Sequence, residues 1–115
     1  MNMDIWPRKA CGAASCEKLA QLFGDLSHPL RLALVRYLLA TQEDCVCSLS
    51  SACHVDQPTL SRHLRILKDH GVVTDRREGA KAIYRVIDSR VAPILDSLGV
   101  LGQSHRAPHF TEEEP

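Results

Sequence analysis

Residues 44–71 are DCVCSLSSACHVDQPTLSRHLRILKDHG, and this stretch predicts two consecutive helices joined by a tight turn. The first helix spans roughly Cys47 to Cys53 and the turn His54 to Asp56, whose carboxylate can cap the second helix. Pro58 suits a first helical turn, and Gly71 suits the residue after a helix end. One face of the second helix carries leucines at a helical spacing: Leu60, Leu64 and Leu67. A short helix, a short turn and a second helix form a helix-turn-helix.

After this second helix the sequence pattern changes from one typical of a helix to one typical of β-strands. Residues 72–77 and 81–87 are rich in β-branched side chains and flank Glu78-Gly79-Ala80, which predicts a β-hairpin. The hairpin and its turn are basic, as in the wing that follows a helix-turn-helix.

Two helices are expected before this unit and one after it. Residues 15–26 carry an apolar stripe, and residues 30–40 are apolar on most sides, so the latter helix should be central and buried. Ser27-His28-Pro29 separates them, with Ser27 as the expected cap and Pro29 in the first turn of the second helix. A last helix, residues 89–101, is expected to start at Asp88 or Ser89, with Pro93 either in its first turn or at a kink.

The expected fold is therefore mainly α with a β-hairpin, a winged helix-turn-helix in the order α-α-α-α-β-β-α. Residues 1–14 are expected to be a flexible arm, 15–101 the DNA-binding and dimerisation domain, and 102–115 a disordered acidic tail. The terminal helices have apolar stripes and little to cover them, so residues 15–26 and 89–101 are expected to form a homodimer interface.

Composition narrows the class of protein. The chain has 115 residues, one domain by length, and is 44% hydrophobic and 24% charged, as in soluble proteins. No apolar run approaches the length of a membrane span, and the N-terminus lacks the pattern of a signal peptide, so a cytoplasmic protein without a membrane partner is expected. The sequence shows neither a nucleophile–base pairing nor a phosphate-cradling glycine loop. Neither an enzyme nor an organic cofactor is therefore expected.

Charge is uneven along a chain whose net charge is zero. Residues 57–85 hold seven Lys/Arg against three acids, the footprint of a small nucleic-acid surface or, alternatively, of a solvated charged face. The second helix of the helix-turn-helix is expected to expose side chains that reach bases or phosphates of double-stranded DNA: Gln57, Thr59, Ser61, Arg62, His63 and Arg65. The wing is expected to supply contacts to the DNA backbone from three cations: Arg76, Arg77 and Lys81.

Cys45 and Cys47 flank a loop-to-helix junction, where both sulfurs can converge on one soft ion. Two thiolates are too few for a tight site. Cys11 and Cys16 lie on or near the predicted arm and can cross to the other subunit, whereas Cys53 is interpreted as a small buried hydrophobe. The alternatives are core packing of Cys45 and Cys47, incidental exposed thiols at Cys11 and Cys16, a thiol-redox switch, and a zinc-stabilised interaction module with structural cysteines.

Taken together these motifs resemble the ArsR/SmtB family of metal-responsive repressors over about residues 15–100. The resemblance is carried by five runs: 26–32 (LSHPLRL), 44–49 (DCVCSL), 57–64 (QPTLSRHL), 71–73 (GVV) and 76–79 (RREG). It implies a dimeric winged-helix repressor that releases operator DNA when a metal or metalloid binds.

The resemblance also implies a site and its ions. The arsenic branch of the family has a third thiol where this chain has Ser50. The lead/cadmium branch pairs Cys-Val-Cys with two N-terminal cysteines, which Cys11 and Cys16 resemble. The expected inducers are therefore As(III)/Sb(III) or Cd(II)/Pb(II), bound by Cys45 and Cys47 with Cys11 and/or Cys16. The family's second site, near the last helix, is expected to be absent: Asp88 is present, but Arg90 replaces a histidine and His105 and His109 are out of place.

Overall fold

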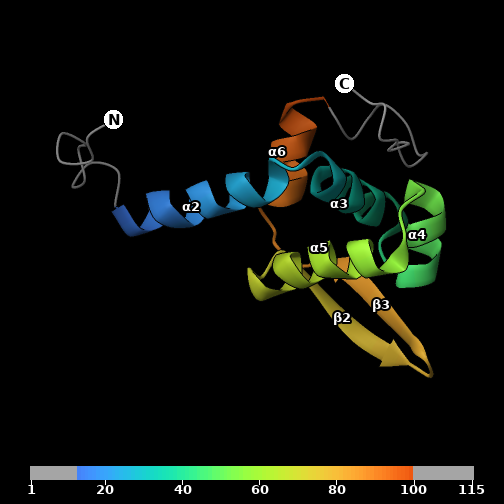
Figure 1. Ribbon diagram of the computed structural model, residues 1–115. Helices are drawn as coiled ribbons and strands as arrows, with labels where there is room; N and C mark the ends of the chain where they lie inside the picture. Colours follow the sequence, from blue (N-terminus) through green and yellow to red (C-terminus); the bar gives the residue numbers. More distant parts are fainter. Residues whose placement is uncertain (1–12, 100–115) are drawn as a thin grey trace.

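The computed structural model describes residues 13–99. Its elements, in chain order, are α2 (Ala13–Leu26), α3 (Pro29–Thr41), β1 (Asp44–Cys45), α4 (Val46–Cys53), α5 (Gln57–Asp69), β2 (Val73–Glu78), β3 (Lys81–Val86) and α6 (Val91–Ser97). Figure 1 shows the β2–β3 hairpin projecting below α5, with α4 at one end and α2 extending from the opposite side. The predicted winged helix-turn-helix is confirmed. Apart from residues 13 and 14, the predicted arm (1–14) and the acidic tail (102–115) lie outside the described residues.

The core is built around α3, as the sequence predicted. Leu34, Val35 and Leu38 are fully buried, because this helix is apolar on most of its circumference. The buried leucines of the helix-turn-helix belong to the same cluster: Leu49, Leu60, Leu64 and Leu67. The helix-turn-helix is therefore fixed to the rest of the domain by its apolar side, and its polar side is left for contacts with other molecules.

The cap of α3 differs from the prediction. His28, rather than Ser27, is the N-cap: its Nδ1 accepts a hydrogen bond of 3.1 Å from the backbone N–H of Leu30. The Ser27 hydroxyl instead donates to the carbonyl of Gly24, at 2.7 Å, at the end of α2. Pro29 begins α3, as expected for a residue with a fixed φ and no N–H to satisfy.

The second helix of the helix-turn-helix begins and ends as predicted. The Asp56 carboxylate accepts from the backbone N–H of Thr59, at 3.0 Å. At the other end, the N–H groups of Gly71 and Val72 donate to the carbonyls of Lys68 and Leu67, at 3.0 and 2.9 Å. This is a Schellman ending, and it requires the positive φ of Gly71, +77°. The direction in which the chain enters the wing is thereby fixed.

The sheet contains one strand that the sequence did not predict. β2 and β3 form the expected antiparallel hairpin around Gly79, and the two-residue strand β1 adds to the outer side of β3. Asp44 pairs with Tyr84 and Cys45 with Ile83. The pairing places Cys45, the residue before α4, directly beside the wing.

The two terminal helices are amphipathic. In α2, Leu22 and Leu26 are buried, while Leu19 and Phe23 remain 39% and 51% exposed. The last helix is shorter than the predicted 89–101: α6 covers Val91–Ser97, and Leu98 follows it with 69% exposure. Among the described residues, no helix is long and apolar enough to cross a membrane.

Candidate DNA interface and thiol site

The exposed face of α5 carries the side chains expected to face DNA, with two exceptions. Gln57, Ser61, Arg62 and Arg65 are exposed. Thr59 is half-buried, and its hydroxyl is 2.9 Å from the capping carboxylate. Its main contact is therefore the cap itself, and the prediction that Thr59 is an exposed position is wrong.

His63 is the second exception. It is half-buried next to the leucine stripe, because a helical repeat places it one turn from the buried Leu60 and Leu67. Its ring lies 4.5 Å, centroid to centroid, from that of His28. Burial lowers the pKa of His63, and the neighbouring His28, Arg31 and Arg62 lower it further. The neutral ring is partly buried against His28, so the prediction that His63 is an exposed position is wrong.

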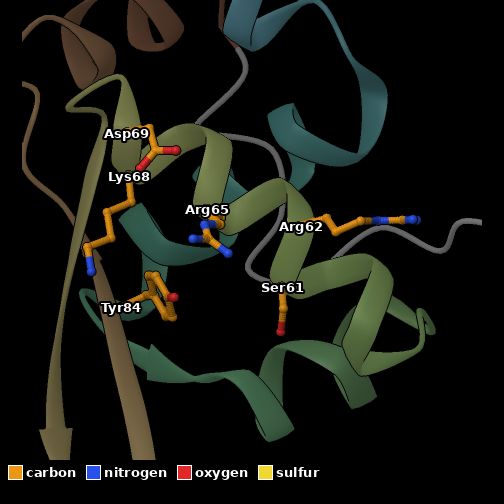
Figure 2. A pocket seen from close by; sticks show the side chains of 6 residues that line it. All are labelled: Ser61, Arg62, Arg65, Lys68, Asp69 and Tyr84. Atoms are coloured by element: carbon orange, nitrogen blue, oxygen red, sulfur yellow. The ribbon is translucent and has the colours of Figure 1, made fainter.

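A hollow of about 440 Å³ lies between α5 and the wing. It is lined by Ser61, Arg62, Arg65, Lys68, Asp69 and Tyr84. Figure 2 shows Arg65 and Lys68 on either side of the Tyr84 ring, whereas Arg62 points away from it. Burial and the nearby Asp75 raise the pKa of Tyr84, so its hydroxyl keeps its proton and can donate. Two cations, Arg65 and Lys68, and a neutral phenol suit a phosphate of the DNA backbone.

Lys68 and Tyr84 were not among the residues predicted for the DNA surface. Lys68 falls one turn after Arg65, so helical spacing could have placed it on this face. Tyr84 reaches the hollow from β3, a contact that depends on how the wing folds against α5. Lys68 is also held by Asp75, with Nζ 2.7 Å from the carboxylate oxygen.

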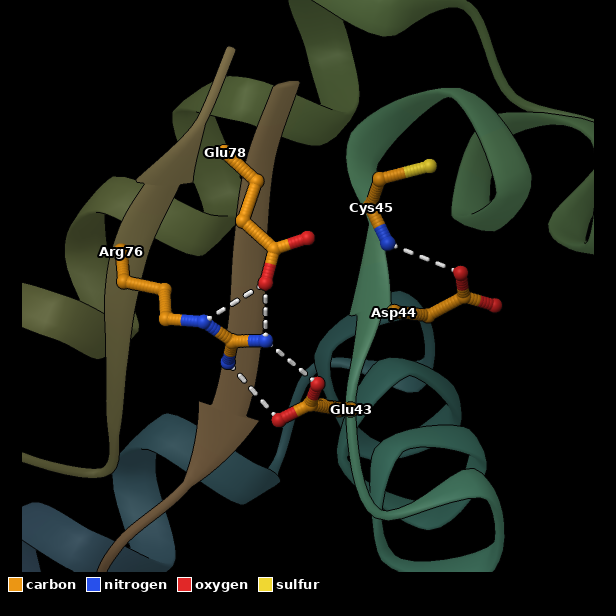
Figure 3. A network of polar contacts seen from close by, with 5 residues as sticks. All are labelled: Glu43, Asp44, Cys45, Arg76 and Glu78. Carbon is orange, nitrogen blue, oxygen red and sulfur yellow. Dashed lines mark hydrogen bonds and ion pairs between the residues drawn. The ribbon is translucent and has the colours of Figure 1, made fainter.

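The three cations predicted for the wing are not equivalent. The Arg76 guanidinium donates to both oxygens of Glu43, at 2.8 and 2.7 Å, and to Glu78, at 2.6 Å (Figure 3). It ties the wing to the segment before α4, and two carboxylates offset its charge. Arg77 and Lys81 are exposed, and within residues 13–99 neither forms an ion pair. They are the wing cations left to attract phosphate.

Cys45 occupies the N-cap position of α4 in an extended conformation and is 7% exposed. Its Sγ lies 3.3 Å from the Ser48 hydroxyl. The nearby hydroxyl and backbone N–H of Ser48 stabilise the thiolate and so lower the pKa of the Cys45 thiol, which favours the form that a soft ion needs. The backbone N–H of Cys45 donates to Asp44 at 2.8 Å, and Asp44 accepts from the Tyr37 hydroxyl at 3.0 Å.

Cys47 lies in the first turn of α4 and is exposed. The side-chain amide of Gln57 donates to its Sγ, with a distance of 3.6 Å between the nitrogen and the sulfur. The two thiols border one hollow of about 220 Å³, whose lining is Cys45, Val46, Cys47, Gln57, Ser61, Arg77, Ala80, Lys81 and Ala82. Cys45 and Cys47 thus both line a hollow beside the start of α5 and the tip of the wing.

The other cysteines are separate from this hollow. Cys53 is fully buried, and burial raises the pKa of its thiol, in agreement with its interpretation as a small hydrophobe. Cys16 is half-buried near the start of α2, which Figure 1 shows on the opposite side of the molecule from α4. Cys11 lies outside the described residues. Within the described part of one protomer, no three His, Cys, Asp or Glu side chains form a group that could hold a metal ion.

Comparison with known sequences gives the family. The sequence profile of "Bacterial regulatory protein, arsR family" matches residues 28–75, from the start of α3 into the wing. The HTH-type transcriptional repressor SmtB of Mycobacterium tuberculosis (strain H37Rv) is 41% identical over 98 residues, which cover 84% of this chain and 68% of that protein. The chain belongs to the arsR family of bacterial regulatory proteins.

Two further members of the comparison agree with this assignment. The arsenical resistance operon repressor of Escherichia coli (strain K12) is 39% identical over 79 residues, 66% of this chain and 68% of that protein. A homodimeric winged helix-turn-helix DNA-binding domain of Mycobacterium bovis has a TM-score of 0.68 at 31% identity, covering 86% of this chain and 88% of the other. This arsR-family chain is therefore a transcriptional repressor of the winged helix-turn-helix type.

The family's second metal site, near the last helix, includes the position of Asp88. In this chain the Asp88 carboxylate forms an internal ion pair. Arg90 donates to both oxygens of Asp88, at 2.9 and 2.6 Å, and this lowers the pKa of the Asp88 carboxyl. His105 and His109 lie outside the described residues.

Proposed function

We propose that this repressor binds its operator as a homodimer and is released when a thiophilic ion binds to Cys45 and Cys47. The observation that carries the proposal is that both thiols border one hollow with Gln57 and Ser61, at the N-terminal end of the helix expected to enter the major groove. An ion bound by these sulfurs therefore lies next to the surface of the protein that binds DNA. The DNA contacts are assigned to Gln57, Ser61, Arg62 and Arg65 on α5, to Arg77 and Lys81 on the wing, and to Lys68 and Tyr84 between them.

The donor set fits soft ions. Thiolates select thiophilic metals and metalloids over Mg²⁺ or Ca²⁺, and the lowered pKa of Cys45 supports binding at neutral pH. Two sulfurs leave an As(III), Sb(III), Cd(II) or Pb(II) ion short of a ligand. Because α2 begins far from α4 in the same protomer, the third sulfur is assigned to Cys16 or Cys11 of the partner subunit. The name of the relative from Escherichia coli, an arsenical resistance repressor, favours As(III) as the first ion to try.

The terminal helices support the dimer. Leu19 and Phe23 stand on the outer face of α2, one turn apart, and Leu98 follows α6. Large apolar side chains with this exposure are suited to burial against a second copy, and the related domain of Mycobacterium bovis is homodimeric. A dimer also presents two α5 helices to two half-sites, which a single small domain cannot do.

Release is a linkage between two ligands. Weakening operator binding by tenfold to a hundredfold requires the ion to favour the DNA-free form by about 1.4–3 kcal/mol. The same factor must appear in reverse, so operator DNA must weaken ion binding equally.

The test is the operator affinity of the reduced, full-length protein under anaerobic conditions, titrated with arsenite, antimonite, cadmium, lead and zinc. A saturable loss of affinity with one or two of these ions, reversed by a competing dithiol, supports the proposal. Loss of affinity only after exposure to an oxidant, with no response to any ion, would replace it with a thiol-redox repressor of the same fold.

A further inference from the structure

The hollow beside Cys47 contains two kinds of side chain that ordinarily serve different ligands. Its sulfurs suit a soft ion, whereas Arg77, Lys81 and Ser61 suit an oxyanion. Both sets line the same space of about 220 Å³. Neither Arg77 nor Lys81 has a carboxylate partner within residues 13–99, so the basic side of the hollow is not neutralised internally.

One side chain connects the two sets. Gln57 is the first residue of α5, and its amide nitrogen is 3.6 Å from Cys47 Sγ. The N-terminal part of the second helix of a helix-turn-helix contacts base edges in the major groove, so this end of α5 is where DNA is expected to lie. Cys47 is itself exposed at the edge of that path.

We propose that a group held on Cys47 excludes DNA directly, within one protomer, because it occupies the hollow that a backbone phosphate of the operator enters. The inference rests on the proposed function and specifies how release occurs there. Inducer and phosphate compete for the space bordered by Gln57, Arg77 and Lys81. This competition lowers operator affinity without any change in the spacing of the two subunits.

The test attaches a small charged group to Cys47 in place of an ion. In the full-length Cys11→Ser/Cys16→Ser/Cys45→Ser variant, Cys47 is the accessible thiol, since Cys53 is fully buried. Methanethiosulfonate reagents add either a sulfonatoethyl group or an aminoethyl group, which are similar in length and opposite in charge. Mass spectrometry verifies the adduct, and circular dichroism and sedimentation verify fold and dimer.

The expected result is an operator affinity at least fivefold lower for the sulfonatoethyl adduct than for the aminoethyl adduct at position 47. The matched control combines Cys47→Ser with Ser89→Cys in the same background, since Ser89 is exposed and precedes α6, away from the hollow. There the two adducts should differ by less than twofold. An equal loss of affinity with both adducts would still support exclusion by occupancy of the hollow, whereas adducts at position 47 that both leave the operator affinity of the unmodified variant unchanged would overturn the inference.

A second measurement follows alkylation by iodoacetamide, peptide by peptide, in the wild-type chain and in a Ser89→Cys variant. Operator DNA should slow alkylation of Cys47 at least tenfold in both proteins, while leaving the rate at position 89 of the variant unchanged. An unprotected Cys47 in the DNA complex contradicts the inference. The proposed function fails separately, if no ion releases the wild-type protein. Release by an ion without protection of Cys47 or any effect of the adducts would leave that function standing and refute direct exclusion.

Discussion

Asp25 Oδ1 lies 2.6 Å from His70 Nδ1, so a carboxylate on α2 is tied to the residue that caps the C-terminal end of α5. Asp25 is 4% exposed, and its other neighbour is Arg31, with nitrogen and oxygen 3.6 Å apart. The contact joins the helix expected to dimerise with the helix expected to read DNA.

We predict that Asp25→Ala lowers the free energy of unfolding by about 1–3 kcal/mol, because it leaves His70 and Arg31 without their shared acceptor. Urea unfolding at pH 7 measures the change. Glu17→Ala is the control: it removes an exposed acid from the same helix and should cost less than about 0.5 kcal/mol. Equal effects of the two substitutions would show that the buried contact is unimportant.

The free energy of unfolding should decrease at acidic pH because His63 takes up a proton more readily in the unfolded chain. Its pKa is lowered in the folded state by burial and by His28, Arg31 and Arg62, so the unfolded chain takes up a proton first. The free energy of unfolding is therefore expected to decrease as the pH falls through and below about 6.5. Above that pH, both states carry a neutral His63 and the contribution is constant.

Urea unfolding between pH 7.5 and 5 tests this. The decrease should be smaller in His63→Gln than in the wild type, whereas His54→Asn, at an exposed histidine with positive φ, should leave it unchanged. Identical pH profiles for wild type and His63→Gln contradict the assignment.

The outer face of α2 should control assembly. Phe23→Glu places a charge on the apolar face and is expected to weaken dimerisation by about a hundredfold or more. Gln21→Glu adds the same charge at another exposed position of α2 and should have little effect. Sedimentation velocity measures both, and a dimer of unchanged affinity in Phe23→Glu would exclude this face.

The wing cations should differ in their contribution to DNA binding. Lys81→Ala is expected to weaken binding similarly on all sequences and to reduce the slope of log affinity against log salt by about 1. Arg76→Ala should change the slope by less than half as much, because Glu43 and Glu78 already offset that charge. The comparison fails if both variants change the slope alike.

Local signals explain why so much of the helix-turn-helix was predictable. Asp56, Pro58, the leucine stripe and Gly71 each act within one or two turns of α5, so each is visible in a short window of sequence. The order of helices and the wing followed from the same kind of pattern. The choice between Ser27 and His28 as the cap of α3 did not, because adjacent residues can both cap and backbone geometry decides.

Features that depend on distant segments were missed. β1 is a strand only because Asp44 and Cys45 pair with residues 83–84 of the wing. Arg76 is engaged by Glu43, which lies far from it in sequence, and this contact changes its expected part in DNA binding. The junction at Cys45 and Cys47 was visible as a place where sulfurs converge, but its shared hollow with Lys81 depends on the folded wing.

The most direct test of the account is the operator affinity of the Cys45→Ser/Cys47→Ser variant, measured with and without the ion that releases the wild type. Affinity without the ion should stay within about twofold of wild type, and adding the ion should not reduce it. Cys53→Ala, which keeps both thiols of the hollow, should still be released. Release of the double variant at the ion concentration that releases the wild type would contradict the account.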